Sequence, residues 1–239
     1  MESKNIVLIT YGNVKVVRYN KPKKRNALDI NMYMTVSRIL EEAARDDDIS
    51  VVVLTGTGGI YSSGNDITAP RKSEGAYDLF SALNDFIRSF INFPKILIAM
   101  VNGPAIGIAA TTLPLCDLVY ASENSYFYTP FTKLGIVPEG CSTFTFPRIM
   151  GERKAVEMLM FNYKMPAEEA LKCGLINGVF KEEELQQKVW DRIKNVTNLR
   201  FESLIESKKL LRGPIRDKLL EINDIELRSV KYLVNRSKI

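Results

Sequence analysis

Two apolar runs, each ending in glycine, constrain the fold of this chain more than any other feature. They are ISVVVLTG at residues 49–56 and KILIAMVNG at residues 95–103. Successive positions in both runs are apolar, which is typical of a strand buried on both faces. Residues 29–45 and about 76–92 carry apolar side chains at helical spacing. Strands that alternate with helices predict an α/β protein with a parallel sheet.

The two ends of the chain differ from this central pattern. Near the start, two β-branched runs on either side of Tyr11-Gly12-Asn13 predict a hairpin. From about residue 151 the chain is mainly helical, and the helices predicted there cover residues 151–161, 166–175, 182–198, 201–212 and about 214–234. We therefore divide the chain into a core over residues 1–195 and a helical C-terminal region over residues 196–239.

The chain contains no histidine. This excludes Ser-His-Asp and Cys-His nucleophilic catalysis, and it removes the commonest zinc ligand. We expect no metal, because Cys116, Cys141 and Cys173 also lack metal-binding spacing. Acid–base chemistry must then depend on Asp, Glu, Lys, Tyr or Cys.

The net charge of +5 is compatible with anionic partners such as phosphorylated cofactors, nucleic acid or anionic lipid, although solubility alone would explain it. No apolar run reaches the length of a membrane span. The first residues are too polar for a signal peptide and lack the arginines of a transit sequence. We expect no membrane partner.

Two glycine-bearing loops directly follow the buried strands. They are SSGND at residues 62–66 and NGPAIG at residues 102–107. Backbone amides at such strand-to-helix turns point into the crevice at the strand ends, and two converging amides would form an oxyanion hole. Taken singly, each loop is also explained as an ordinary glycine turn.

A glutamate in an apolar stretch is the third candidate feature. Glu139 lies between Pro138 and Gly140 in LGIVPEGCSTF. Most glutamates in loops are simply exposed to solvent, and Glu139 can be explained in the same way. A glutamate kept in apolar surroundings would instead suit proton transfer.

These segments occur in a fixed order after the basic loop NKPKKRNAL at residues 20–28. The series resembles the crotonase (enoyl-CoA hydratase/isomerase) superfamily over nearly the whole chain. The strings YSSGND, VNGPAIG and TPFTKLGIVPEGCSTFTFP are most similar to the peroxisomal-type Δ3,Δ2-enoyl-CoA isomerases. The resemblance implies a crotonase-like spiral of ββα units, with a helical C-terminal trimerisation region and a homotrimer or hexamer.

The resemblance also implies roles for particular residues. It assigns the acid–base role to Glu139 and the oxyanion donors to the backbone amides of Asn65 and Ile108. The segments that contact coenzyme A in the family match Lys23, Lys24, Arg25, Ser63, Gly64, Asp66 and Ile67. The implied reaction moves the double bond of a 3-enoyl-CoA thioester to give trans-2-enoyl-CoA, in the oxidation of unsaturated fatty acids. Coenzyme A belongs to the substrate, so no separate cofactor is expected.

Departures from the family pattern bear on the reaction. The two glutamates with which hydratases activate water would fall at Thr111 and Phe131. Neither side chain transfers protons, so water addition is not expected. Hydrolysis, decarboxylation and dienoyl-CoA isomerisation remain alternatives, and the last would call for a further acid such as Asp66. Cys141 is a candidate nucleophile that lacks an activating histidine.

A non-enzymatic RNA-binding member of the superfamily is the alternative from another class. An RNA-binding helix should present a row of lysines. The helix after Asp29 instead carries Glu41, Glu42 and an acidic end at residues 46–48. We therefore expect an acyl-CoA thioester as the partner and no nucleic acid.

The chain ends in Ser237-Lys238-Ile239. This tripeptide is similar to the C-terminal S-K-L signal of peroxisomal proteins. We therefore expect a peroxisomal import receptor as a partner and a peroxisomal location, with the mitochondrion as the alternative. A solvated tail that matches by chance is the simpler explanation.

Overall fold

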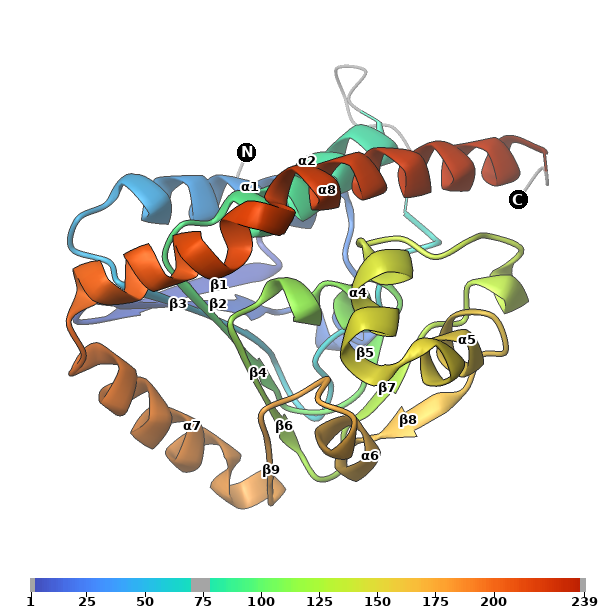
Figure 1. Cartoon of the computed structure of the whole chain (residues 1–239). Helices are drawn as coiled ribbons and strands as arrows, with labels where there is room; N and C mark the ends of the chain where they lie inside the picture. Colours follow the sequence, from blue (N-terminus) through green and yellow to red (C-terminus); the bar gives the residue numbers. More distant parts are fainter. Residues whose placement is uncertain (1–2, 70–77, 237–239) are drawn as a thin grey trace.

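The computed structural model describes residues 3–69 and 78–236, in which strands and helices alternate (Figure 1). The strands are β1 Ile6–Tyr11, β2 Val14–Tyr19, β3 Val51–Gly56, β4 Ile96–Val101, β5 Ala105–Ile106, β6 Leu118–Ser122, β7 Tyr126–Tyr128, β8 Lys164–Pro166 and β9 Gly178–Phe180. The α-helices are α1 Ile30–Arg45, α2 Leu79–Asn92, α3 Ile108–Thr111, α4 Ser142–Met150, α5 Glu152–Leu159, α6 Ala167–Lys172, α7 Glu182–Thr197 and α8 Phe201–Arg236. Short 3-10 helices are η1 Pro22–Lys24, η2 Leu113–Leu115 and η3 Thr132–Leu134. No helix within the described ranges is long and apolar enough to cross a membrane.

The main sheet has six strands in the order β1-β2-β3-β4-β6-β9. The predicted hairpin is confirmed, because β1 pairs antiparallel with β2. The predicted parallel sheet is confirmed as well, since β2, β3, β4, β6 and β9 pair in parallel. A second sheet, β5-β7-β8, was not predicted. Its strands have only two or three residues each, too few for a periodic pattern to be visible.

Helices cover both faces of the main sheet, which explains why its central strands are mostly apolar. Val52 and Leu54 of β3 pack in the cluster that includes α1, α2 and α8. Their neighbours Val51 and Val53 point the other way, into the cluster that α7 covers. In Figure 1, α1, α2 and α8 lie together along one side of the molecule and α7 lies on the opposite side.

Helix α1 begins where the sequence predicts. The side chain of Asp29 accepts a hydrogen bond of 3.0 Å from the backbone N–H of Met32, which caps the helix. Helix α2 is capped in the same way by Asp78, which accepts from the N–H of Ser81 at 2.8 Å. It therefore starts at Leu79. The predicted start at residue 76 lies outside the described residues.

The prediction of two helices over residues 201–212 and 214–234 is wrong. The structure has one helix, α8, that continues through Pro214. Proline removes one backbone donor from a helix, but tertiary contacts on both sides offset that cost. Lys208 binds Asp117 and Arg212 binds the carbonyl of Cys116 before the proline. Beyond it, the buried side chains of α8 include Leu219, Leu227 and Val230.

Helix α4 was not predicted, because Pro147 lies within it and its N-cap, Cys141, makes no side-chain capping bond. The proposed domain boundary at residues 195/196 falls in the last turn of α7. It stays a prediction.

Candidate active site

A cavity of about 480 Å³ brings together most of the residues that the sequence analysis selected. It is lined by Lys23, Lys24, Arg25, Ala27, Ser63, Asn65, Asp66, Ile67, Thr68, Ile106, Gly107, Ile108, Pro130, Phe131, Leu134, Ile136 and Glu139. Of the predicted site residues, Gly64 alone is not part of this lining. The basic loop, both glycine-bearing loops and the glutamate segment therefore meet at one place.

Backbone hydrogen bonds hold the two glycine-bearing loops against each other. The N–H of Ile106 donates to the carbonyl of Ser62 at 3.0 Å. Gly64 has a φ of +83°, and a Cβ there would lie 2.6 Å from the carbonyl oxygen of Ile106. Any side chain at this position would push the loops apart. The role of Gly64 is therefore structural: it permits the close approach.

The backbone amides of Asn65 and Ile108 are the predicted oxyanion donors. Both residues line the cavity. Within residues 3–69 and 78–236, neither amide donates a hydrogen bond to a protein acceptor. Ile108 is the first residue of α3, where a helical N–H has no partner within the helix. Two amides are thus left for an acceptor in the cavity.

Glu139 lies deep in the site, with an exposed fraction of 1%. Its Oε1 accepts a hydrogen bond of 3.1 Å from the side-chain amide of Asn65. The phenol of Tyr33 on α1 donates in turn to the Asn65 carbonyl oxygen, which fixes the amide so that its NH₂ group faces Glu139. Glu139 Oε2 is buried and has no partner among the described residues. One carboxylate oxygen is therefore held, and the other is left to take a proton.

Burial raises the pKa of Glu139 to about 8. The nearby carboxylate of Glu226 adds to the increase, and the hydrogen bond from Asn65 opposes it. A carboxyl group with this pKa both accepts and returns a proton near neutral pH, as a single acid–base residue must.

The turn after Glu139 requires its glycine. Gly140 has a φ of +75°, and a Cβ there would lie 2.4 Å from the side-chain oxygen of Thr111. Cys141 follows with a φ of 62°, and α4 begins at the next residue. Thr111 and Phe131, at the positions of the two hydratase glutamates, are both buried. Thr111 therefore packs against the turn that presents Glu139.

The basic rim of the cavity is partly neutralised. Asp66 accepts from Lys21 at 2.8 Å and from Lys24 at 3.1 Å. Although Asp66 is buried, its bonds with these lysines and Thr68 hold its pKa well below its usual range. Asp66 is therefore a fixed anion that orders the basic loop. Lys21, which also binds Asp29 at 2.6 Å, was not singled out from the sequence.

The two alternative chemical roles find no support in this geometry. The Cys141 thiol is buried against the carbonyl of Leu219 at 3.3 Å, and burial raises its pKa above the usual range. A thiolate nucleophile there is disfavoured. Asp66 is paired with two lysines and cannot act as the further acid of a dienoyl-CoA isomerase.

A second cavity, of about 240 Å³, adjoins the first at Asn65 and Glu139. Its outer wall comes from α2 and α8, through Leu79, Phe80, Leu83, Val230 and Val234. Glu139 thus stands between a cavity with a basic rim and a mainly apolar one. The sequence analysis did not predict this second cavity.

The sequence analysis missed four side chains that contribute to the site. They belong to Asn65, Tyr33, Lys21 and Glu226. Each acts through a partner far away in the sequence. Tyr33 fits the apolar stripe of α1, so its hydroxyl gave no separate signal. The one available sign was the charged residue Glu226 among apolar residues of α8 such as Leu227 and Val230.

Comparison with solved structures identifies the class of protein. An enoyl-CoA hydratase/isomerase from Pseudoalteromonas atlantica T6c superimposes with a TM-score of 0.91 at 29% identity, over 97% of this chain and 92% of that one. The fold is therefore of the crotonase type, as predicted.

The sequence comparisons then identify the family. The model of the enoyl-CoA hydratase/isomerase family matches residues 10–239, and the chain belongs to that family. It is 44% identical to human enoyl-CoA delta isomerase 2, over 91% of this chain and 57% of the relative. It is 41% identical to mouse peroxisomal enoyl-CoA delta isomerase 3, over 93% of this chain and 71% of the relative. The chain thus spans little more than half the length of the human relative.

Proposed function

We propose that this chain is a Δ3,Δ2-enoyl-CoA isomerase that uses Glu139 as its single acid–base residue. The observation that carries the proposal is the buried carboxylate, which has one oxygen held by Asn65 and one oxygen without a partner. Relatives named enoyl-CoA delta isomerase support the reaction class.

The mechanism follows from the arrangement of the cavity. The thioester oxygen accepts hydrogen bonds from the amides of Asn65 and Ile108, which stabilise the negative charge that develops when the α-carbon loses its proton. Each such donor is typically worth about 3–4 kcal/mol. Glu139 removes the α-proton and returns a proton to the γ-carbon. No net change in protonation is needed, so one carboxyl group suffices.

The two adjoining cavities suggest how a thioester would lie. The basic residues Lys23, Lys24 and Arg25 would attract the phosphates of coenzyme A at the rim of the larger cavity. The apolar wall formed by α2 and α8 would take the acyl chain. Glu139, which borders both cavities, would then lie beside the carbons next to the thioester.

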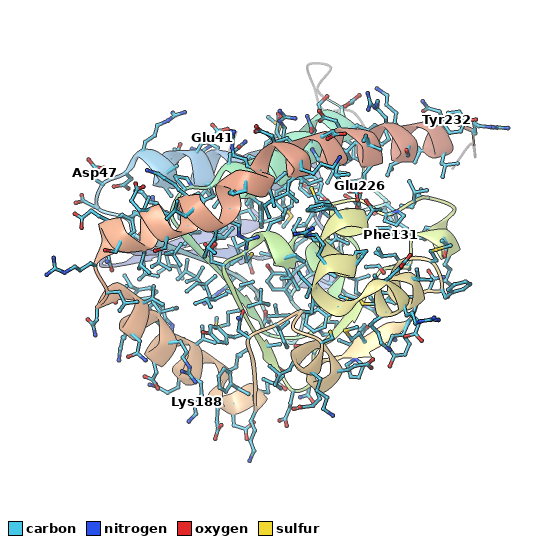
Figure 2. All side chains as sticks on the ribbon, in the orientation of Figure 1. Glu41, Asp47, Phe131, Lys188, Glu226 and Tyr232 are labelled. Atoms are coloured by element: carbon cyan, nitrogen blue, oxygen red, sulfur yellow. The ribbon has the colours of Figure 1, made fainter. Side chains whose placement is uncertain are left out.

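Turnover of 3-enoyl-CoA thioesters tests the proposal directly. We expect the wild-type protein to form 2-enoyl-CoA, and Glu139→Gln to lose activity by at least about 100-fold, because an amide cannot accept the α-proton. Glu41→Gln removes an exposed carboxylate of α1, away from the cavity (Figure 2), and should retain full activity. Near-wild-type turnover by Glu139→Gln would refute the mechanism. Absence of turnover by the wild type, on substrates of several chain lengths, would refute the function.

A peroxisomal location is part of the proposal, supported by the mouse relative that is named peroxisomal. Ser237, Lys238 and Ile239 lie outside the described residues. A fluorescent reporter that ends in these residues should become punctate like an S-K-L control. A diffuse reporter would remove the support for an import signal.

A further inference from the structure

Glu226 is a buried carboxylate for which the proposed mechanism has no role. Its exposed fraction is 4%. It lies on α8, which is 36 residues long, on the side that faces α4 (Figure 2). A charged residue is almost never buried this deeply unless it is paired or fully hydrogen-bonded.

The partners of Glu226 belong to the turn that presents Glu139. Oε2 accepts from the backbone N–H of Cys141 at 2.7 Å. Oε1 accepts from the N–H of Thr143 at 2.9 Å and from its hydroxyl at 2.6 Å. All three partners donate, so both oxygens act as acceptors, as the ionised form provides. Gly140 and Cys141 have positive φ values, so this turn needs outside support.

We propose that Glu226 is a positioning residue for Glu139, so that the acid–base group is correctly placed only when the C-terminal helix α8 is docked. The proposal rests on the proposed function, since it assigns the proton transfer to Glu139. A second contact between the same turn and α8 supports it: the thiol of Cys141 lies 3.3 Å from the carbonyl oxygen of Leu219.

Glu226 also affects Glu139 through its charge. Its negative charge is one of the causes that raise the pKa of Glu139. Burial raises the pKa of Glu226 itself to about 7, against the lowering effect of its three hydrogen bonds. The phenol of Tyr33 from α1 and the amide of Asn65 from the loop that follows β3 also face Glu139, and neither carries a charge. The charged residues that line the two cavities beside Glu139 are Lys23, Lys24, Arg25, Asp29 and Asp66. Glu226 is the charged group among the causes that raise the pKa of Glu139, so it is the one to vary.

The test compares Glu226→Gln with Glu221→Gln, which removes an exposed carboxylate of the same helix. The full chain is assayed for isomerisation across pH. The titration midpoint of the Glu139 carboxyl group is measured separately, without substrate, by ¹³C NMR of labelled glutamate. Glu139→Gln identifies which signal belongs to Glu139. For Glu226→Gln we expect that midpoint, and the acidic limb of kcat/KM, to move down by about one pH unit. We also expect kcat on the high-pH plateau to fall by about tenfold with little change in KM. Glu221→Gln should match the wild type in every respect.

Glu226→Asp distinguishes the effect of side-chain length from the effect of charge. It keeps the negative charge but shortens the side chain by one methylene, so kcat should fall while the midpoint of Glu139 stays close to that of the wild type. An unchanged Glu139 midpoint in Glu226→Gln would overturn the effect of charge. An unchanged kcat in Glu226→Asp, or a loss that appears in KM instead, would overturn the positioning role. Should the wild type not isomerise 3-enoyl-CoA at all, the proposed function fails, while the NMR midpoint still decides whether Glu226 acts on Glu139.

Discussion

At the residue scale, the carboxylate of Glu139 is unusual because its two oxygens have different surroundings. Asn65 donates to Oε1, whereas Oε2 is buried without a partner among the described residues. Leaving an acceptor buried and unsatisfied costs free energy and disfavours the ionised form. The same feature suits a group that must carry a proton from one carbon to another.

The activity should depend on pH through Glu139. Because its pKa is raised to about 8, the ionised form of the carboxyl group, which acts as the base, is the minor form of the free protein at pH 7 and increases as the pH rises. We expect kcat/KM for 3-enoyl-CoA to rise with pH, with its midpoint near pH 8. Rates measured from pH 5 to 9 check this. A profile that is flat from pH 5 upward would show that another group abstracts the proton.

The stability should depend on pH in the opposite direction. A carboxyl group with a raised folded-state pKa binds its proton more tightly in the folded than in the unfolded chain. The free energy of unfolding therefore falls as the pH rises from about 4.5 to 8. Glu139→Gln removes this effect and should be more stable than the wild type at pH 7, by roughly 3 kcal/mol at most. Thermal melts at pH 4.5 and pH 7 measure the difference. Equal stabilities at pH 7 would contradict the raised pKa.

At the scale of elements, turns rather than helices or strands place the chemical groups. The amides of Asn65 and Ile108 lie in or next to glycine-bearing loops, and Glu139 immediately precedes a left-handed turn. The surrounding sheet and helices hold these turns through long-range contacts such as the bond from Tyr33 to Asn65. Small changes in a turn should therefore affect both stability and catalysis.

Gly140→Ala tests how tightly the turn after Glu139 is constrained. Alanine adds the strain of a φ near +75° to a clash with Thr111 at 2.4 Å. We expect a loss of about 2–4 kcal/mol in the free energy of unfolding, together with lower activity. Gly12→Ala is the matched control, because Gly12 also has a positive φ but no atom of the described residues lies within 4 Å of the added Cβ. It should lose about 1 kcal/mol. Equal losses in the two variants would mean that the clash is relieved at no cost.

At the scale of the whole molecule, charge and apolar surface are unevenly distributed. Lys23, Lys24 and Arg25 line one cavity and give it a basic rim. Leu210 and Leu211 on α8 are 78% and 76% exposed. The first feature bears on the proposed attraction of an anionic substrate, and the second bears on the predicted contact between subunits.

Lys23→Glu tests the basic rim, since it leaves the pair between Lys24 and Asp66 intact. We expect the KM for CoA thioesters to rise several-fold at low ionic strength and the effect to shrink at high salt, because the attraction to phosphate is screened. Lys188→Glu makes the same change in net charge on α7, away from the cavity (Figure 2), and should leave KM unchanged. Equal effects of the two variants would mean that net charge alone matters.

The predicted trimer would bury exposed apolar side chains of the C-terminal region. We expect Leu210→Glu combined with Leu211→Glu to weaken assembly, because charged side chains are costly in an apolar interface. Sedimentation of the two proteins at micromolar concentration measures the change, with Leu8→Glu on β1 as the control. A wild-type protein that sediments as a monomer would contradict the prediction.

Features that depend on neighbouring residues could be predicted from the amino-acid sequence. The runs of β3 and β4 predicted buried parallel strands, and Asp29 predicted the start of α1. The absence of histidine excluded histidine-based catalysis, and the family resemblance assigned the acid–base role to Glu139. The strands and the helix start are local patterns, since periodicity and capping involve residues close together in the chain.

The contacts between distant side chains became visible in the folded structure. It showed that Tyr33 orients Asn65, that Asp66 is held by Lys21, and that Glu226 reaches the turn at Cys141, 85 positions away. It also showed that α8 continues through Pro214, because packing outweighs the local preference for a break. Contacts of this kind leave no pattern in the sequence, since they depend on how the elements dock rather than on how each one forms.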